Sequence, residues 1–426
     1  MEQRDGKAPK PRPAFLPKAV ANTQDLDIPQ TLIEDLMIRR LSMDGSGSII
    51  TMSNLLKLPV PVVQQLFERL RQQHIFEVTG MEGYNYSFTL SGRGRDYATK
   101  RISICHYAGP APVSLKDYQS AVRKQASKVK LNRTDLEQCF SDLVLTTRFL
   151  DQLGPALVSQ NSLFLYGPTG NGKTSVVRRL SRIYKDPIAI PYAVEFQGQI
   201  IVLFDPAVHH AVGATEAIFP DPRWVCCNRP CLLVGGELEP SMLELKLDDS
   251  SGIYAAPIQM KANNGMLVID DFGRQILSPQ YLLNRWIVPM DRKIDYLTLR
   301  YGVKFEIPFE ITVVFSTNLD PAELADEAFL RRIQNKIYME PVQAEVFDDI
   351  FRRLLVQRNL TIDDTTVPLL RDICLRRGSG DLRACYPVDI LNILDSISVY
   401  EEHPITITRA SLERAVSNYF AATMSV

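Results

Sequence analysis

The sequence lacks several features that would place it in particular protein classes. None of its apolar runs approaches the ~20 residues of a membrane-spanning helix, so we expect no membrane span in these 426 residues. The polar, proline-rich residues 1–18 contain no apolar stretch of the kind found in a signal peptide. The net charge of −1 argues against a chain that binds polyanions over its whole surface. The seven cysteines are odd in number and scattered, which favours reduced thiols in a cytoplasmic protein.

The first part of the chain has two expected segments. Residues 1–24 are predicted to be a disordered tail, and residues 25–107 a separate folded unit. In this unit a helical stretch precedes a Gly-Ser break, a helix–turn–helix, two strand-like pieces and a last helix that begins near Ser91. This order is that of a winged helix, which the unit resembles.

The remainder divides by its pattern of strands and helices. We predict a basic linker over residues 108–133, where Lys and Arg outnumber acids. Strand-type and helix-type segments then alternate over residues 134–342, which predicts a parallel sheet flanked by helices. From residue 343 to 426 the pattern is entirely helical.

The most specific motif lies between a strand-like run and a helical one. Residues 167–174 read Gly-Pro-Thr-Gly-Asn-Gly-Lys-Thr, which matches the P-loop pattern G-x-x-x-x-G-K-[ST] at every fixed position. Glycines let backbone N–H groups turn towards phosphate oxygens, Lys173 reaches the outer phosphates, and Thr174 places its hydroxyl on Mg²⁺. The sequence therefore predicts a nucleoside triphosphate site made by Gly167, Pro168, Thr169, Gly170, Asn171, Gly172, Lys173, Thr174 and Ser175.

Polar side chains follow two further apolar strands. Asp270 and Asp271 end the run 266–269, where Asp270 can hold Mg²⁺ and Asp271 can position water or act as a base. Asn318 ends the run 312–317, and its amide would lie beside the γ-phosphate. Taken alone, paired carboxylates can cap a helix and an Asn usually forms a turn.

Arginines complete the ordered set. Arg331 and Arg332 close one helix, and Arg383 lies in residues 380–384, which open another helix in the helical C-terminal part. A single arginine is more often a surface ion-pair partner. P-loop, paired carboxylates, Asn318 and these arginines, in this order, resemble the AAA+ ATPase family over about residues 134–426.

The resemblance implies a fold and a role for each residue. The fold would be an α/β P-loop NTPase with a parallel sheet flanked by helices, a helical C-terminal lid and the N-terminal winged helix. Asp270 and Asp271 would be Walker B and Asn318 sensor 1. Arg383 would be sensor 2, and Arg331 or Arg332 the arginine finger that enters a neighbouring subunit's site. ATP and Mg²⁺ would be bound, and the chain would form a ring, most often a hexamer.

Three details refine the resemblance. The family usually has Glu where this chain has Asp271, so hydrolysis is expected to use a shifted water or to be slow. A long insertion over about residues 205–262 and a hairpin over 294–308 are closest to the MoxR-like and magnesium-chelatase-like branch. The insertion is where such proteins carry a substrate-engaging loop, and the hairpin's position resembles their pre-sensor 1 hairpin.

We predict a cytoplasmic AAA+ ATPase whose ring remodels a macromolecular client, with a protein client and a chaperone role favoured. A first alternative is a DNA-binding motor or regulator that acts through the winged helix. Between Thr51 and Arg101, seven Lys and Arg face four acids, a net of +3, where strong duplex binders are far more basic. A second alternative, motivated by Asp271, is a slow nucleotide-gated scaffold.

Overall fold

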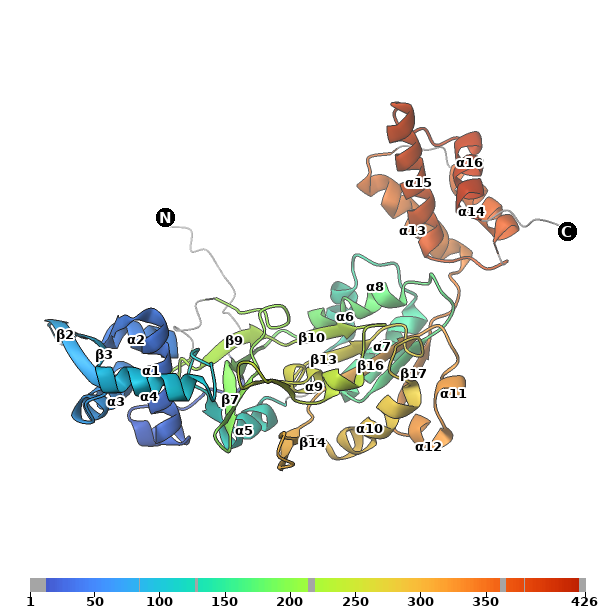
Figure 1. Ribbon diagram of the computed structural model, residues 1–426. Helices are drawn as coiled ribbons and strands as arrows, with labels where there is room; N and C mark the ends of the chain where they lie inside the picture. Colours follow the sequence, from blue (N-terminus) through green and yellow to red (C-terminus); the bar gives the residue numbers. More distant parts are fainter. Residues whose placement is uncertain are drawn as a thin grey trace, which may run out of the picture.

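The computed structural model describes residues 13–83, 85–126, 129–213, 219–360, 365–378 and 380–420. Half of the predicted disordered tail (1–12), Lys128 of the predicted linker and Tyr84 of a predicted strand lie outside the described residues. Figure 1 shows the N-terminal unit at one end of an elongated body, the parallel sheet at the other end, and four C-terminal helices above the sheet.

The N-terminal unit packs helices against a small antiparallel sheet. Its sheet has the strand order β1-β3-β2, and in its core Phe67 stacks on Phe76 and lies tilted against Phe88. The apolar residues that recur along its third helix are buried as their helical spacing predicts. The elements are η1 (Thr23–Leu26), α1 (Gln30–Asp44), β1 (Ser46–Ser48), α2 (Ile49–Leu56), α3 (Val60–Gln72), β2 (Phe76–Glu82), β3 (Asn85–Leu90) and α4 (Gly92–Ile102).

A five-stranded parallel sheet forms the centre of the α/β unit. Its order is β10 (Cys231–Val234), β13 (Met266–Ile269), β16 (Thr312–Thr317), β5 (Leu163–Tyr166) and β17 (Asn335–Tyr338). Every residue of β13 and β16 is buried, as expected for parallel strands covered on both faces.

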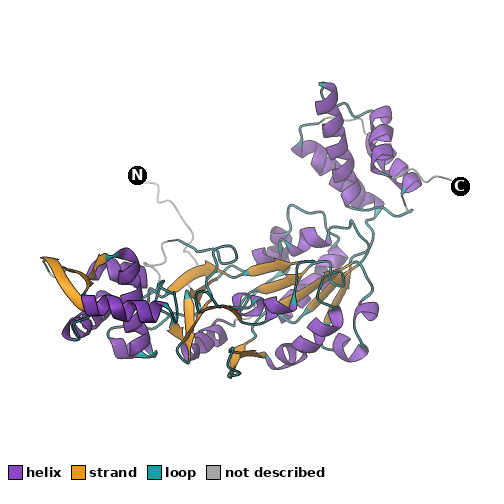
Figure 2. Ribbon diagram, in the orientation of Figure 1, coloured by secondary structure: helices purple, strands orange, loops and turns teal. Residues whose placement is uncertain are grey.

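Helices cover the two faces of this sheet (Figure 2). Leu163 and Leu165 share a core with α6 (Arg133–Cys139), α7 (Thr147–Ser159) and α8 (Lys173–Val177). Phe164, which alternates with them, shares a core with α10 (Pro279–Arg292) and α12 (Glu327–Leu330). α9 (Ile258–Lys261) and α11 (Pro321–Leu324) complete this part. The predicted fold class, a parallel sheet flanked by helices, is confirmed.

A second sheet lies between the N-terminal unit and the parallel sheet (Figure 1). Its strand order is β11-β12-β8-β7-β4, and its residues Ala193 and Ile200 are buried in the core of the N-terminal unit. The strands are β4 (Val113–Ser114), β7 (Ala193–Phe196), β8 (Gln199–Val202), β11 (Lys246–Asp248) and β12 (Ile253–Ala255). A separate pair is formed by β6 (Pro187–Pro191) and β9 (Trp224–Asn228). The short helices in this part of the sequence are η2 (Leu180–Ile183) and η4 (Pro240–Leu243).

The segment predicted as a basic linker contains a packed helix. In α5 (Leu115–Gln125), Tyr118, Ala121 and Val122 are buried in the core of the second sheet, while Lys116 and Lys124 stay exposed. The exposed charges dominated the sequence pattern and concealed the apolar face. The predicted hairpin over 294–308 is present as β14 (Ile294–Thr298) and β15 (Lys304–Pro308), and α5 packs against β15.

The C-terminal helices have a core of their own. α13 (Ala344–Gln357), α14 (Thr366–Arg377), α15 (Cys385–Glu401) and α16 (Arg409–Tyr419) bury Phe347, Phe351, Ile390 and Leu412 between them. We call these four helices the lid. Among the described residues, no helix is both long and apolar enough to cross a bilayer.

Candidate nucleotide-binding site

The P-loop follows β5 at the carboxyl edge of the parallel sheet. Gly167 and Gly170 have φ angles of 144° and 85°, a region that favours glycine. A Cβ atom on Gly167 would lie 2.3 Å from the carbonyl oxygen of Met339, and one on Gly170 would lie 2.6 Å from the Sγ atom of Cys385. The loop therefore lies in close contact with Met339, the residue after β17, on one side and with the first turn of α15 on the other.

Lys173 curls back over this loop. Its ammonium donates to the carbonyl oxygens of Gly167 at 2.8 Å and Pro168 at 2.9 Å. Burial lowers the pKa of Lys173, and the charges of Asp270 and Asp271 partly offset that effect. The side chain thus holds a desolvated cation beside the loop's backbone, which is the arrangement that attracts phosphate oxygens.

Three neighbouring strands bring the remaining polar groups to the same edge. β16 lies between β5 and β13, so Asn318, the P-loop and Asp270 end side by side. The hydroxyl of Thr174 donates to Oδ2 of Asp270 at 2.9 Å. The backbone N–H of Asp271 donates to Oδ1 of Asp270 at 3.1 Å, and Asp271 itself has a φ of 52° and an exposed side chain.

Two amide oxygens show that this edge fits a ligand. Oδ1 of Asn318 and Oδ1 of Asn171 are buried without a hydrogen-bond partner among the described residues. A buried polar atom left in this state costs about 1–3 kcal/mol. The hydroxyl–carboxylate pair of Thr174 and Asp270 is the oxygen donor set that Mg²⁺ prefers, so the residues present fit a magnesium-bound triphosphate.

A cavity of about 530 Å³ extends from the P-loop to the lid. This volume lies within the usual range of about 300–1,000 Å³ for small-molecule sites. One end is lined by Thr169–Ser175 with Asp270, Asp271 and Asn318, so it is polar. Other lining residues are apolar and come from the loop before α7 and from the lid: Leu143, Val144, Leu145, Ile350, Leu354 and Val388. A polar end and an apolar part suit the phosphates and the base of a nucleotide.

The lid meets the P-loop directly. The backbone N–H of Cys385 donates to the carbonyl oxygen of Gly170 at 2.9 Å. Arg383 lies beside the same glycine, with its Cδ atom 3.3 Å from the position of a Gly170 Cβ, and its guanidinium is 5.9 Å from the centre of the Tyr386 ring. Arg383 thus lies beside the P-loop without lining the cavity, and its role as sensor 2 stays a prediction.

Arg331 and Arg332 do not line this cavity in the described part of the chain. Arg331 lies at the end of α12, its side chain is 77% exposed, and it forms an ion pair with Glu327 at 3.4 Å. Arg332 is held by Asp291 of α10 at 2.8 Å. Both are therefore outside their own subunit's site.

Several cavity residues were missed by sequence reasoning. They are Asp142, Arg179, Arg353, Cys385 and Asp389. None belongs to a local motif, and Arg353 and Asp389 come from the lid, so their position depends on long-range folding.

The run after the P-loop, from Thr174 to Tyr184, has helical spacing in the sequence and forms two helical pieces. α8 ends at Val177, and a 3₁₀ helix, η2, follows from Leu180 to Ile183. Bonds of the i→i+3 type, from Arg179 N–H to Val176 O and from Arg182 N–H to Arg179 O, tighten this stretch.

Comparisons with known proteins concern the lid and the fold. Residues 343–418 match a family model described as a domain of unknown function, DUF8689. No curated protein matches the chain. Among solved structures, the Thermotoga maritima RuvB Holliday junction branch migration motor is 14% identical, with 72% of this chain and 71% of that chain covered and a TM-score of 0.34.

Two further solved structures are 16% identical to this chain. The match to a complex between BchI and BchD of magnesium chelatase covers 63% of this chain and 89% of that chain. The match to the FIGL-1 AAA domain in complex with ADP covers 62% of this chain and 73% of that chain. Each has a TM-score of 0.31. The matched proteins are AAA+ ATPases. Scores this low carry no argument, so the fold is described from the parallel sheet itself and the function is argued from the site. The winged helix stays a prediction.

Proposed function

We propose that this chain binds ATP with Mg²⁺ and hydrolyses it within an oligomeric ring, most simply a hexamer, to remodel a macromolecular client. The observation that supports this most is the grouping of Lys173, the Thr174–Asp270 pair and the unpartnered amide oxygen of Asn318 around one cavity. These groups are the ones that phosphoryl transfer needs, because catalysis of that reaction is mainly positioning and charge stabilisation.

The side chains divide the work of hydrolysis. Lys173 and the P-loop backbone hold the β- and γ-phosphates, and Asn318 and Asp271 orient a water molecule towards the γ-phosphorus. When bound, Mg²⁺ would be held by Thr174 and Asp270 and would neutralise charge on the phosphate oxygens. Attack of the water oxygen breaks the bond to the β-phosphate oxygen, Asp271 takes the water's proton, and ADP and phosphate leave. Arg383 links the phosphate end to the lid, which moves between nucleotide states.

We assign the arginine finger to Arg331. Within the described part of the chain, its exposed guanidinium pairs with Glu327 of its own short helix, whereas Arg332 pairs with Asp291 of another helix. An arginine supplied by a neighbouring subunit can raise the rate of hydrolysis by about 10³–10⁵. The site would then be complete only in the oligomer.

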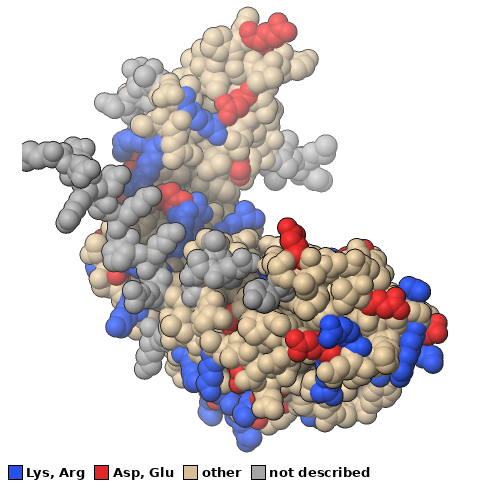
Figure 3. Space-filling model, turned by 90° about the vertical axis from the view of Figure 1, so that its left-hand side faces the viewer, with Lys and Arg blue, Asp and Glu red and all other residues tan. Residues whose placement is uncertain are grey.

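A protein client fits the N-terminal unit better than DNA does. In α3, which would be the DNA-reading helix, Arg69 pairs with Glu34 at 2.9 Å, and Gln65 accepts from the N–H of Thr23 at 3.2 Å. The hairpin that would be the wing carries Glu77 and Glu82 and no Lys or Arg. Figure 3 shows Lys and Arg interspersed with Asp and Glu over the end of the molecule that carries this unit. We therefore propose a chaperone-like role.

DNA remains the alternative client and has a direct test. A DNA-driven motor would hydrolyse ATP faster with DNA present, and its DNA affinity would fall as salt rises. We expect neither effect. Reversing the charge of Arg93 and Arg95 does not rescue the proposal of a protein client. If DNA still stimulates ATP hydrolysis in that variant, other groups bind the DNA and a DNA client is supported.

The rate of hydrolysis separates an enzyme from a slow nucleotide-gated scaffold. In steady-state assays of the full chain, we expect measurable ATP hydrolysis that Asp271→Asn abolishes while nucleotide binding persists. The trapped variant is also suited to capturing the client. Hydrolysis that continues unchanged in Asp271→Asn would remove Asp271 from the mechanism.

All seven cysteines are free, which agrees with the cytoplasmic location that we propose.

A further inference from the structure

We infer that Arg353, on the first lid helix, binds the base–ribose half of the nucleotide, and that Asp142 is a positioning residue that fixes the loop on which Arg353 docks. The inference rests on the proposed nucleotide site and adds a second lid contact to it, at the end of the cavity away from the phosphates.

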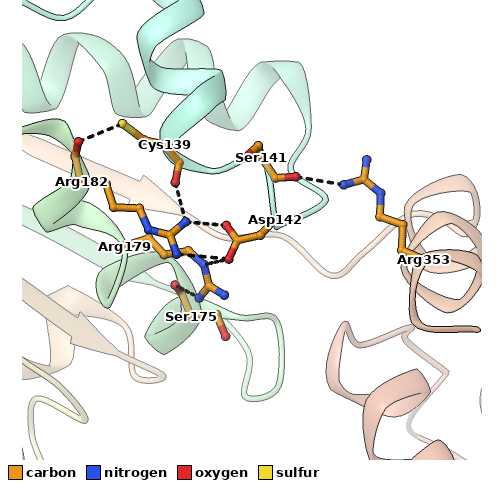
Figure 4. A network of polar contacts seen from close by, with 7 residues as sticks. All are labelled: Cys139, Ser141, Asp142, Ser175, Arg179, Arg182 and Arg353. Atoms are coloured by element: carbon orange, nitrogen blue, oxygen red, sulfur yellow. Dashed lines mark hydrogen bonds and ion pairs between the residues drawn. The ribbon is translucent and has the colours of Figure 1, made fainter. Parts of the chain in front are cut away.

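Asp142 joins the loop before α7 to the segment after the P-loop (Figure 4). One carboxylate oxygen accepts from Arg182 at 2.7 Å, and the other accepts from Arg179 at 2.7 Å. Arg182 also donates to the carbonyl oxygen of Cys139 at 3.0 Å, and Arg179 to that of Ser175 at 2.8 Å. Hydrogen bonding to Arg182 and then to Arg179 lowers the pKa of Asp142 to about 2, although burial opposes this effect.

This clamp, formed by Asp142, Arg179 and Arg182, adjoins the apolar part of the cavity, because Asp142 directly precedes Leu143 in the sequence. Asp142 and Arg179 line the cavity together with the apolar Leu143, Val144 and Leu145. The clamp therefore holds one wall of the apolar part in place before any ligand arrives.

The lid reaches both ends of the cavity. At the phosphate end, Cys385 N–H donates to Gly170 O at 2.9 Å. At the other end, Arg353 of α13 donates to the carbonyl oxygen of Ser141 at 3.3 Å, as Figure 4 shows. Ser141 is the residue next to Asp142, so the clamp fixes the acceptor that Arg353 uses.

Arg353 also lines the cavity, and a guanidinium has five N–H donors. One donor is directed to Ser141 and another to Asp349 of its own helix at 3.1 Å. The remaining donors suit the acceptor nitrogens of a base and the oxygens of ribose. Since ATP and ADP share these parts, Arg353 should contribute to the binding of both equally, whereas Arg383 at the phosphate end should favour one over the other.

The test is calorimetric titration of the full-length chain with Mg·ATP and with Mg·ADP. We expect Arg353→Ala to weaken both nucleotides by the same factor, about tenfold or more for a charged hydrogen bond. In steady-state assays it should raise KM and leave kcat within about twofold. Asp142→Asn should act in the same direction, and the double variant should lose less than the product of the two effects.

The matched control is Arg352→Ala, which removes the adjacent exposed arginine of α13 that does not line the cavity. It should change neither affinity by more than about twofold. Arg353→Lys keeps the positive charge but lacks the planar guanidinium, so its affinity for both nucleotides should lie between those of the wild type and Arg353→Ala. This variant guards against a folding defect in Arg353→Ala.

The outcomes separate this inference from the proposed function. If the wild-type chain binds neither nucleotide, both this inference and the proposed function are wrong. If the wild type binds and Arg353→Ala behaves like Arg352→Ala, this inference alone is overturned. A loss of ATP affinity with ADP affinity unchanged would also overturn it, because it would place Arg353 at the phosphates.

Discussion

Two P-loop glycines provide a matched pair that isolates the contact between loop and lid. Gly170 and Gly172 have φ angles of 85° and 90°, so alanine at either position costs about 1–2 kcal/mol of backbone strain. A Cβ on Gly172 meets nothing within 4 Å, but one on Gly170 would lie 2.6 Å from Sγ of Cys385. Gly170→Ala must therefore also displace the Cys385 thiol, and we expect the first turn of α15 to shift with it.

The displacement adds a cost that only one variant should show. Moving α15 weakens the hydrogen bond from Cys385 N–H to Gly170 O, worth about 0.5–1.5 kcal/mol. An added 1 kcal/mol raises the equilibrium population of the open contact about fivefold. We expect hydrogen exchange at the Cys385 amide, measured without nucleotide, to accelerate by about that factor in Gly170→Ala relative to Gly172→Ala.

Removing the thiol should restore the contact. In Gly170→Ala/Cys385→Ala the new methyl group has no sulfur to displace, so exchange should return to the rate of Gly172→Ala. Equal exchange rates in Gly170→Ala and Gly172→Ala would refute the reasoning, because the lid would then not rest on the loop as described.

Two other predictions concern charged residues. Arg331→Ala should abolish most ATP hydrolysis and leave ATP affinity within about threefold, whereas Arg332→Ala should keep most activity. Mixing Arg331→Ala with Asp271→Asn should restore hydrolysis, because one variant supplies the finger and the other supplies the intact site. Equal losses of activity in Arg331→Ala and Arg332→Ala would contradict the assignment of the finger. The pKa of Asp142 is lowered to about 2 from an unfolded value near 3.9, so its stabilising effect is complete above pH ~4 and is lost as the pH falls towards 2. Thermal midpoints of wild type and Asp142→Asn should therefore converge only in that acidic window, and convergence near neutral pH would contradict the clamp.

The grouping of the predicted polar residues at one edge of the sheet could be anticipated from the sequence, for a physical reason. The P-loop, Asp270 and Asn318 each follow a buried strand, and parallel strands end at one edge of a sheet. The grouping thus follows from local patterns and a single topological rule. The same pattern of alternating strands and helices predicted the sheet and the helices on its two faces.

The base end and the second sheet depend on contacts that no local pattern encodes. Arg353 and Ser141 are 212 residues apart in sequence, and Asp142 gains its role only from two arginines after the P-loop. In α5 the exposed lysines concealed a buried face, so a packed helix was predicted as a linker. The strands of the second sheet have two to four residues each, too short for a reliable alternation.

The most direct test of the central claim is calorimetric titration of the wild-type chain and Lys173→Ala with a magnesium-bound, non-hydrolysable ATP analogue. Loss of the buried ammonium, which contacts Gly167 O and Pro168 O, should weaken binding by at least about tenfold, the effect of one charged hydrogen bond. Binding by the wild type and a marked loss in Lys173→Ala are the predicted result. Wild-type protein that releases no heat of binding, or a variant that binds as tightly as the wild type, would contradict the account.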